Sequence, residues 1–219
     1  MGETVSKIVT CPKCSQQSES QVLCSANTAG KPEIRSLLMK DKLFAWKCPK
    51  CGFQTQLLHP FLYNDLANRF MIYYIPKAEK RSIADEKLET EYSDLSEIKK
   101  RVVPTVNALK EKITLFQKDL NDMAMELAKL AVLRVVEKST AQTVYEGYFL
   151  DMDRSENTVT FQFFIGTEKR PYIQTTRLEV YHRSLSIVQQ YFSDADRQKG
   201  FLNVDRKWAG EALKIYKNA

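Results

Sequence analysis

The chain has 219 residues, of which 43% are hydrophobic and 27% are charged, and its formal net charge is +6. This composition is typical of a soluble protein with one large or two small domains, and no stretch reaches the roughly 18 apolar residues of a membrane span. Its opening residues carry no apolar core of a signal peptide, and five cysteines are too few for a disulfide scaffold, so we expect a cytoplasmic protein without a membrane segment.

The first 76 residues are predicted to form short strands around one helical insertion. Period-two patterns predict strands at residues 5–10 and 18–27. Gly30 and Pro32 then interrupt the strand pattern, and Pro32 suits the first turn of a helix. The apolar face of this helix is expected to hold Ile34, Leu37 and Leu38.

Extended structure is predicted to return at residues 43–60 and again at residues 69–76. In the first of these segments, Phe44, Trp46 and Cys48 share one face by period-two alternation. The second segment, RFMIYYIP, ends at a proline. Together with the earlier strands, these segments predict a small antiparallel sheet.

The tetrapeptide CPKC occurs twice, at Cys11–Cys14 and at Cys48–Cys51. A CxxC pair places two thiolates on one tight turn, and a second pair completes the sulfur tetrahedron that zinc accepts. In a reducing compartment this pattern indicates a metal site before a disulfide. One Zn²⁺ ion is therefore predicted to bind four residues, namely Cys11, Cys14, Cys48 and Cys51.

Residues inside and next to the two motifs are expected to affect the turn geometry and the charge of the metal site. The proline inside each motif narrows the turn, and Gly52 can take the positive φ that points backbone N–H groups at sulfur. Ser15 stands at the equivalent place after the first motif, where we expect some strain. Lys13 and Lys50 would partly neutralise a zinc–tetrathiolate site. Cys24, in an apolar run, is predicted to be a small buried hydrophobe.

Four thiolates can also hold iron, as in a rubredoxin-like electron carrier, and this alternative stays open. Zinc is favoured because the basic motif region and the large remainder of the chain do not resemble a small redox protein. A catalytic zinc keeps one coordination position for water, whereas four cysteines fill the shell. No HExxH or deaminase pattern occurs in the sequence, so the expected role of the metal is structural.

Residues 77–104 carry many alternating charges and few apolar side chains. They are predicted to form a charged linker or helix between a metal-binding module, residues 1–76, and a C-terminal region, residues 105–219. From Val106 to Leu130 apolar residues recur at steps of three and four. This pattern predicts one helix packed on a core, or two helices with Asn121 or Asp122 capping the second, and a coiled-coil dimer is the alternative.

The pattern changes to period two after residue 143. The segments VYEGYFLDMD and TVTFQFFIG predict a β-hairpin. Two helices are predicted to close the chain, the second with Asp205 as its N-cap and with Trp208, Ala212 and Ile215 buried. The predicted class is therefore α+β, with a zinc-ribbon-like N-terminal sheet that contains a helical insertion, followed by helices and a β-hairpin.

The segment TCPKCSQQSESQV, a helical insert and WKCPKCGFQTQLLHPFLYNDLANRFMIYYIP follow one another as in the prokaryotic CpXC-domain family. The chain resembles this family over roughly residues 8–135, since RVVPTVNALKEKI and NDMAMELAKL are similar to the family's helical continuation. The resemblance implies a zinc-binding domain without an established activity. Only Cys11, Cys14, Cys48 and Cys51 carry over as functional residues, and Ser15 departs from the glycine common after the motif.

No residue pattern argues for an enzyme, because neither a nucleophile triad nor a glycine-rich phosphate loop is recognisable, and His59 and His182 are expected to be packed or exposed. We expect a binding or assembly module for a protein partner or a second copy. Nucleic-acid binding is the alternative, because most of the basic excess lies in residues 1–80. Its candidate residues are Lys40, Lys42, Lys47, Lys50 and Arg69, with Phe44, Trp46 and Phe53.

Overall fold

A computed structural model describes residues 2–28, 31–77, 82–83, 98–195 and 200–219. Helices and strands are mixed along the chain, which confirms the predicted α+β class. The chain divides into two compact units, called unit 1 and unit 2 below. None of the described helices is long and apolar enough to cross a membrane.

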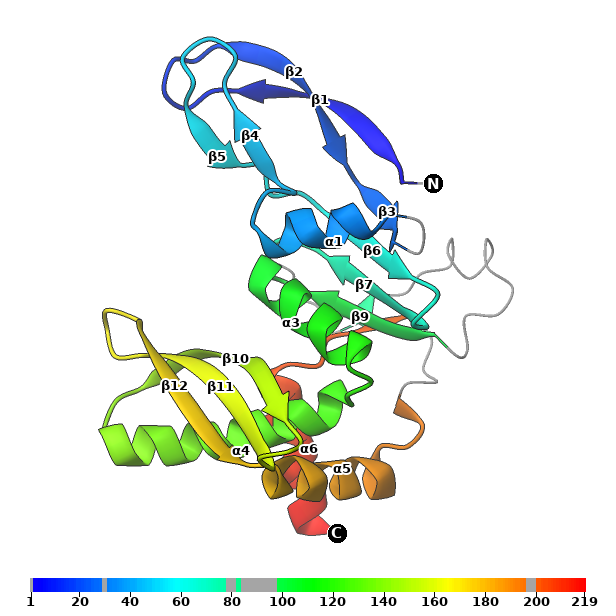
Figure 1. Cartoon of the computed structure of the whole chain (residues 1–219), viewed down its shortest axis with the longest axis vertical. Helices are drawn as coiled ribbons and strands as arrows, with labels where there is room; N and C mark the ends of the chain where they lie inside the picture. The colour runs from blue at the N-terminus through cyan, green and yellow to red at the C-terminus, as the bar shows by residue number, and fades with distance from the viewer. Residues whose placement is uncertain (1, 29–30, 78–81, 84–97, 196–199) are drawn as a thin grey trace. The chain divides into compact units, whose positions relative to one another are not determined.

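Unit 1 comprises Met1–Lys110 and Lys199–Phe201. It begins with two antiparallel hairpins that lie side by side (Figure 1). They are β1 (Thr4–Thr10) with β2 (Gln17–Leu23), and β4 (Ala45–Lys47) with β5 (Gln54–Gln56). The strands predicted from the period-two patterns around the two CPKC motifs are therefore present.

The predicted helical insertion forms α1 (Pro32–Met39), with Pro32 in its first turn. Ile34 and Leu38 are buried as predicted. Leu37 is 38% exposed, so the prediction that it joins the apolar face is wrong. The helix therefore buries a narrower face than its sequence pattern indicates.

The centre of unit 1 is a six-stranded mixed sheet in the order β3-β6-β7-β9-β13-β8. Strand β6 pairs antiparallel with β7, whereas β3 with β6 and β7 with β9 are parallel pairs. Met71, Val102 and Phe201 are buried together on one face. The strands are β3 (Ser25–Asn27), β6 (Phe61–Asp65), β7 (Phe70–Tyr74), β8 (Ser82–Ile83), β9 (Lys99–Val103) and β13 (Phe201–Leu202).

Four strands of this sheet, β6, β8, β9 and β13, lie where the sequence predicts none. Strand β6 directly follows the predicted extended segment 43–60, and β9 lies inside segment 77–104, which is predicted as a charged linker or helix. Most of segment 77–104 lies outside the described residues, but its described end is a strand. Lys100 and Arg101 are buried there, so their charges hide the strand pattern in the sequence.

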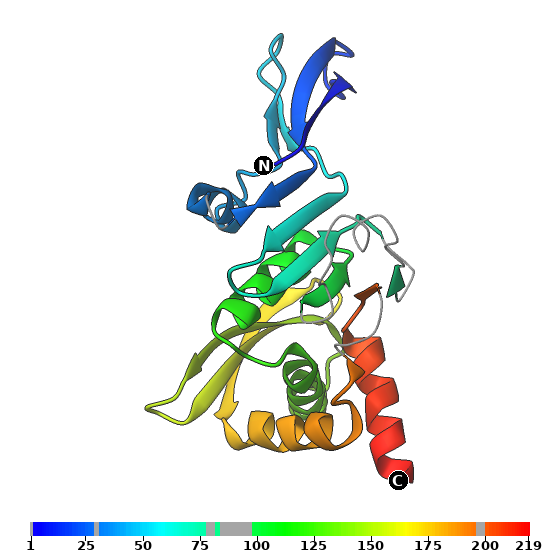
Figure 2. The ribbon, with the colours of Figure 1, turned by 90° about the vertical axis from the view of Figure 1, so that its right-hand side faces the viewer.

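Unit 2 comprises Glu111–Gln198 and Leu202–Ala219. An antiparallel sheet in the order β10-β11-β12 packs on α4, and α5 and α6 contact the same helix (Figure 2). Helix α3 begins in unit 1 and ends in unit 2. The elements are α3 (Val106–Gln117), α4 (Asp122–Thr140), β10 (Val144–Asp153), β11 (Thr158–Ile165), β12 (Arg170–Arg177), α5 (Glu179–Tyr191) and α6 (Arg206–Asn218).

Residues 106–130 belong to two helices. Helix α3 ends at Gln117, and Asn121 caps α4 because its side chain accepts a hydrogen bond from the Ala124 N–H at 2.9 Å. This confirms the two-helix interpretation with Asn121 as the cap. The coiled-coil alternative is wrong, because the run is interrupted between α3 and α4 and its second half, Leu120, Met123, Leu127 and Leu130, is buried in the core of unit 2.

The predicted hairpin forms as β10 and β11, and β12 extends it to three strands. Strand β12 is not predicted by the sequence pattern, because its residues are mostly polar, and five of its eight residues are exposed. Both closing helices are present, and the Asp205 side chain caps α6 by accepting from the Trp208 N–H at 2.9 Å. Ala212 is buried as predicted, whereas Ile215 is 52% exposed, so its predicted burial is wrong.

A network of buried charges lies between α3 and α4. The Lys129 Nζ atom lies 2.8 Å from Glu111 Oε1 and 2.8 Å from Glu126 Oε1. The Lys112 Nζ atom lies 2.8 Å from Asp122 Oδ2. All five side chains are buried, although the sequence pattern gives no sign of it.

Candidate metal centre

The first CPKC motif forms the turn between β1 and β2. The Cys11 N–H donates to the Gln16 carbonyl at 2.9 Å, and the Ser15 N–H donates to the Cys11 carbonyl at 2.9 Å. This turn places Ser15 at a φ of 55°. A residue with a Cβ atom is disfavoured in the left-handed region by roughly 1 kcal/mol, which agrees with the strain expected at Ser15.

The second motif repeats this turn between β4 and β5. The Cys48 N–H donates to the Phe53 carbonyl at 2.8 Å, and the Gly52 N–H donates to the Cys48 carbonyl at 3.0 Å. Gly52 has a φ of 70°, which glycine adopts without a Cβ clash. The backbone hydrogen bonds of the two turns match residue for residue, so both turns present their cysteine pairs in the same way.

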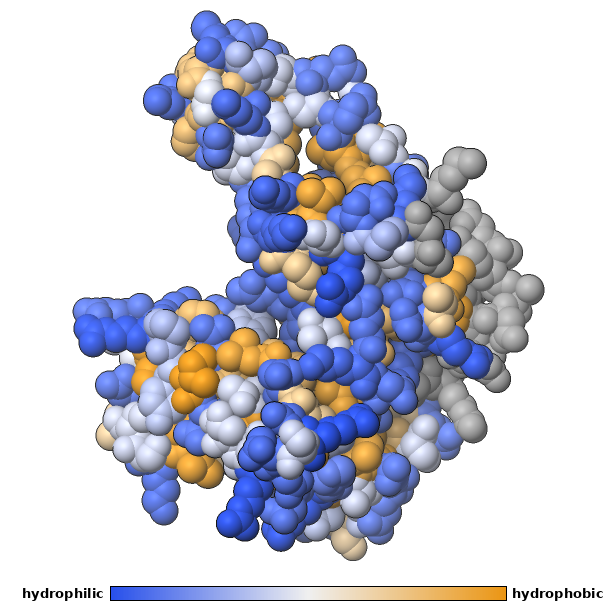
Figure 3. Space-filling model, viewed as in Figure 1, coloured by the Kyte–Doolittle hydropathy of each residue, from blue (hydrophilic) through white to orange (hydrophobic). Residues whose placement is uncertain are grey.

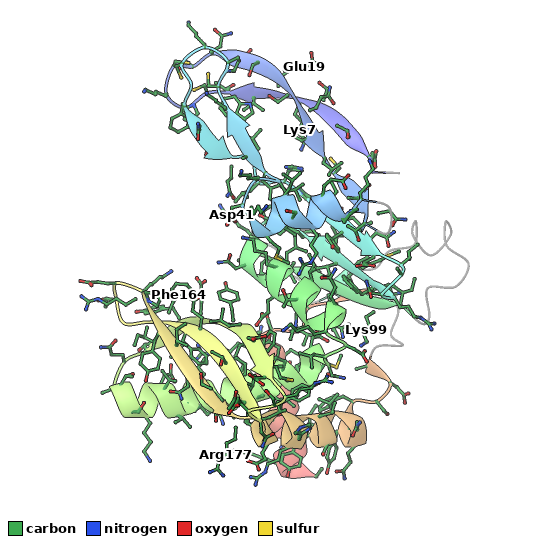
Figure 4. The ribbon with its side chains drawn as sticks, in the orientation of Figure 1. Lys7, Glu19, Asp41, Lys99, Phe164 and Arg177 are labelled. Carbon is green, nitrogen blue, oxygen red and sulfur yellow. The ribbon has the colours of Figure 1, made fainter. Side chains whose placement is uncertain are left out.

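The structure brings all four predicted cysteines together, with their Sγ atoms within 4.8 Å of one another. The Cys11 and Cys51 Sγ atoms are 3.6 Å apart, and the Cys14 and Cys48 Sγ atoms are 3.7 Å apart. Zn–S distances near 2.3 Å in a tetrahedron correspond to sulfur–sulfur distances of about 3.8 Å. The cluster can therefore hold one metal ion with sulfur ligands alone, and Figure 4 shows its sulfur atoms in yellow between the hairpin turns.

The two cysteines of each motif differ in their exposure to solvent. Cys11 is 1% and Cys48 is 2% exposed, whereas Cys14 and Cys51 are half-buried. The first cysteine of each motif thus lies inside the module and the second lies closer to solvent. A metal ion held by all four sulfurs would be shielded from water on one side by the two inner cysteines.

The thiols differ in how readily they lose a proton. Backbone hydrogen bonds from Cys51, the larger effect, and from Lys50 lower the pKa of Cys48 to about 6. A backbone hydrogen bond from Gln16 lowers the pKa of Cys14, but burial and the three neighbouring thiols outweigh it and raise that pKa to about 12. Cys48 is thus the more acidic and Cys14 the less acidic of these two thiols, and a bound cation would favour the thiolate form of both.

Few apolar side chains support the two hairpins. In β1 only Val9 is even half-buried, and in β4 and β5 only Trp46 and Thr55 are. The Trp46 Nε1–H donates to Ser20 Oγ at 2.9 Å and links the hairpins, a contact between distant residues that no sequence pattern predicts. The visible surface of the hairpins is mainly hydrophilic (Figure 3).

Three other candidates from the sequence lie outside the cluster. Cys24 is half-buried between β2 and β3, so its predicted burial is only partial. His59 is 8% exposed, and its Nδ1 and Nε2 atoms lie 2.7 Å from the Leu57 carbonyl and 2.9 Å from the Leu23 carbonyl. His182 is exposed on α5. The contacts of His59 connect two segments of unit 1.

The candidates for nucleic-acid binding divide into two groups. Phe44 is 5% exposed and packs against Phe61 and Tyr74, so it belongs to the core and offers no stacking surface. Trp46 and Phe53 are half-buried. The basic candidates are all exposed, namely Lys40, Lys42, Lys47, Lys50 and Arg69.

Comparison with known proteins agrees with this site. The family model described as CpXC protein matches residues 9–129, more than half of the chain, and this range contains both cysteine motifs and the start of α4. A search of curated proteins and a search of solved structures each found no match. The spacing of the motifs, the four-sulfur cluster and the family match agree with the resemblance seen in the sequence, and the chain belongs to the CpXC family.

Proposed function

We propose that the four cysteines bind one zinc ion and that this ion has a structural role. The observation that carries the proposal is the closed set of four Sγ atoms presented by two matching turns. Zinc accepts four thiolates in a tetrahedron, and structural zinc sites are commonly built this way. A shell filled by cysteines leaves no position for water or substrate, which favours a structural over a catalytic role.

A rubredoxin-like iron centre is the alternative, because iron accepts the same four thiolates. Two exposed lysines, Lys13 and Lys50, lie inside the motifs and offset part of the negative charge of four thiolates. They serve either metal equally. The choice of zinc therefore rests on the large size of the protein outside the motifs, which an electron carrier does not need.

Metal analysis of the full chain tests the assignment. We expect one zinc ion per chain and no visible absorption, whereas one iron ion with a visible sulfur-to-iron absorption band would replace zinc by iron. The Cys48→Ser variant should lose the metal. Cys24→Ser removes a thiol outside the cluster and should keep the metal. Unchanged metal content in Cys48→Ser would overturn the site itself.

We further propose that the chain acts in the prokaryotic cytoplasm as a binding or assembly module and not as an enzyme. A protein partner or a second copy is favoured because large apolar side chains are exposed on the two hairpins and directly after β5. Ile8 is 76% exposed on β1, where it stands opposite Glu19, and Leu58 is 53% exposed after β5. Exposed apolar side chains beside polar ones are common at protein interfaces.

Nucleic-acid binding remains the second candidate, because five basic side chains of unit 1 are exposed. The two candidates differ in their response to salt. Phosphate contacts release counterions, so nucleic-acid affinity falls steeply with ionic strength, whereas an apolar interface is much less sensitive.

Two measurements on the zinc-loaded chain separate these candidates. Sedimentation equilibrium should show a mass that rises with protein concentration, is insensitive to salt and is reduced by Ile8→Ser. Fluorescence anisotropy with labelled duplex DNA, single-stranded DNA and RNA should show no binding at low salt. Tight binding that falls linearly in a log–log plot against salt would instead favour the nucleic-acid function and direct attention to the exposed lysines.

A further inference from the structure

A groove of about 610 Å³ lies in unit 2 between α4, α5, α6 and the end of β12. The surrounding helices are seen in Figure 2. Its apolar lining comes from three helices: Leu127 and Ala131 of α4, Val180 and Ile187 of α5, and Leu213 of α6. The groove takes no part in the metal centre, whose residues all belong to unit 1.

The helices leave this apolar surface open because they meet around α4 without closing over it. Leu127 is buried at the floor, whereas Val180, Ile187 and Leu213 are only partly buried against the core. Val180 and Ile187 lie two turns apart on the same face of α5. The groove thus offers a strip of apolar surface rather than an isolated side chain.

Three arginines surround the apolar strip: Arg134 from α4, Arg177 at the end of β12 and Arg183 from α5. All three are exposed, and Figure 4 labels Arg177 next to the start of α5. In the part of the chain that the structure describes, none of their guanidinium groups has an ion pair or a hydrogen bond. Glu179 is the acidic residue among the described groove residues, so the lining carries an excess of positive charge.

This charge is local to the groove. Residues 111–198 and 202–219 contain equal numbers of basic and acidic side chains. Another hollow in unit 2, of about 460 Å³, is lined by Arg170 and Glu168, but there the guanidinium and the carboxylate form an ion pair at 2.5 Å. The groove on α4 and α5 therefore combines an apolar floor with arginines that keep their hydrogen-bonding capacity for a ligand.

We propose that this groove binds a small amphiphile with an anionic headgroup, a carboxylate or a phosphate, and a medium-length alkyl tail. The planar guanidinium fork matches the oxygens of both headgroups, and the strip of leucine, isoleucine and valine side chains removes the tail from water. The groove volume lies in the range of roughly 300–1,000 Å³ that small-molecule sites occupy. Its lining is smaller than the roughly 20–30 residues that each side of a stable protein interface uses, which favours a small molecule over a protein.

Isothermal titration calorimetry on the full zinc-loaded chain, below the micelle concentration of each probe, tests the ligand class. Decanoate and decyl phosphate should bind with one site per chain. Tighter binding of decanoate indicates a free carboxylate ligand, and tighter binding of decyl phosphate indicates a lipid-like phosphate headgroup. Acetate lacks the tail and decyltrimethylammonium carries the opposite charge, so neither should bind. Failure of both anionic amphiphiles to bind, or equal binding of the cationic one, overturns the proposal.

Variants locate the binding in the groove. The double variant Arg177→Gln/Arg183→Gln should bind at least tenfold more weakly, because it removes charge-assisted hydrogen bonds to the headgroup. Ala131→Trp places a bulky side chain over the floor and should abolish binding. Arg154→Gln changes an exposed arginine in the turn between β10 and β11 and should leave affinity unchanged. All these residues are exposed, so folding should be retained, and unchanged affinity in the double variant and in Ala131→Trp overturns the site.

Discussion

The hairpins of unit 1 and the core of unit 2 reach stability by opposite means. Among the described residues of β1, β2, β4 and β5, Val22 of β2 is the buried one, and Cys11 and Cys48 are the buried residues of the two turns. In unit 2, by contrast, Val159, Phe161 and Phe163 alternate as fully buried residues on β11 and pack in one large apolar cluster with α4. The same chain therefore contains one region with very little apolar burial and one with a large apolar core, and we expect only the first to depend on a metal for its fold.

The difference has a physical cause in the size of the hairpins. Ordering each residue costs about 1–2 kcal/mol of backbone entropy, which apolar burial offsets in unit 2. The short hairpins bury little apolar surface, so we expect them to depend on a cross-link such as the proposed metal, as small domains often do. This contrast predicts that perturbations of the metal and of the buried charges act on different units.

The largest expected effect is that of metal removal. Structural zinc contributes an apparent ~10–16 kcal/mol in zinc-finger peptides, so a chelator should unfold the hairpins while unit 2 keeps its fold. Hydrogen exchange followed by mass spectrometry should show loss of protection in β1, β2, β4 and β5, with protection retained in α4 and β11. Parallel loss of protection in α4 would contradict the separation of the two units.

The second effect concerns the buried charges of unit 2. Lys129→Met removes the ammonium that pairs with Glu111 and Glu126 and leaves two carboxylates buried, which should destabilise unit 2 by about 3–5 kcal/mol. Urea unfolding followed by the fluorescence of Trp208 reports on this unit once Trp46 is replaced by phenylalanine. Lys138→Met, an exposed lysine on the same helix, is the control and should change stability by less than about 0.5 kcal/mol.

The third effect is a pH dependence located at Glu126. Burial raises the pKa of Glu126 above its ordinary value of 4.5, although the charges of Lys129 and Lys112 act in the opposite direction. The unfolded chain loses this proton near pH 4.5 while the folded chain retains it, so the folded state binds more protons above that pH. The stability of unit 2 should therefore decrease as the pH rises from about 4.5 through the folded pKa, by at most about 1.4 kcal/mol per pH unit.

Glu126→Gln tests this origin of the pH dependence, because the glutamine side chain is neutral at every pH. Urea unfolding of unit 2 between pH 4 and pH 8 should lose the downward slope in this variant. The same slope in Glu126→Gln would assign the pH dependence to another group of the network. The cysteine cluster lies in unit 1 and should not influence the Trp208 signal.

The same contrast explains what the sequence could predict. Features that depend on neighbouring residues can be predicted from the sequence. The paired cysteines predict the candidate metal site, and the alternation in β11 predicts a strand with one buried face. Asn121 and Asp205 predict the starts of α4 and α6. Each of these signals lies within a few residues of the structure it specifies. They locate the candidate site and most elements correctly.

Non-local burial is not visible in the same way. The charges of Lys100 and Arg101 predict a solvated segment, yet both residues are buried in β9, a strand that forms only because it pairs with β7, about 30 residues earlier in the chain. Glu111 and Lys129 likewise lie 18 residues apart and are paired only by the packing of α3 on α4. The error at Ile215 is the opposite one: its helical spacing predicts burial, but no element of the fold covers it and the side chain is exposed.

The smallest expected effect lies in the two metal-binding turns themselves. Ser15 and Gly52 occupy the same place in matching turns, with φ values of 55° and 70°. Ser15→Gly relieves the left-handed strain of roughly 1 kcal/mol, and the larger entropy of glycine in the unfolded chain offsets part of this gain. Because metal binding is coupled to folding of the hairpins, the zinc dissociation constant should decrease by up to about fivefold.

Gly52→Ser makes the reverse change and should weaken zinc binding by a similar factor. The closest atom to a Cβ at this residue is Lys47 Cε at 3.7 Å, so the serine side chain fits and the cost is one of backbone conformation alone. Competition with a chromogenic chelator measures both variants against the unchanged chain. Opposite shifts of the two zinc dissociation constants would show that both turns need a residue with positive φ at this place. A weaker affinity in Ser15→Gly would show that the serine contributes to the site through its side chain.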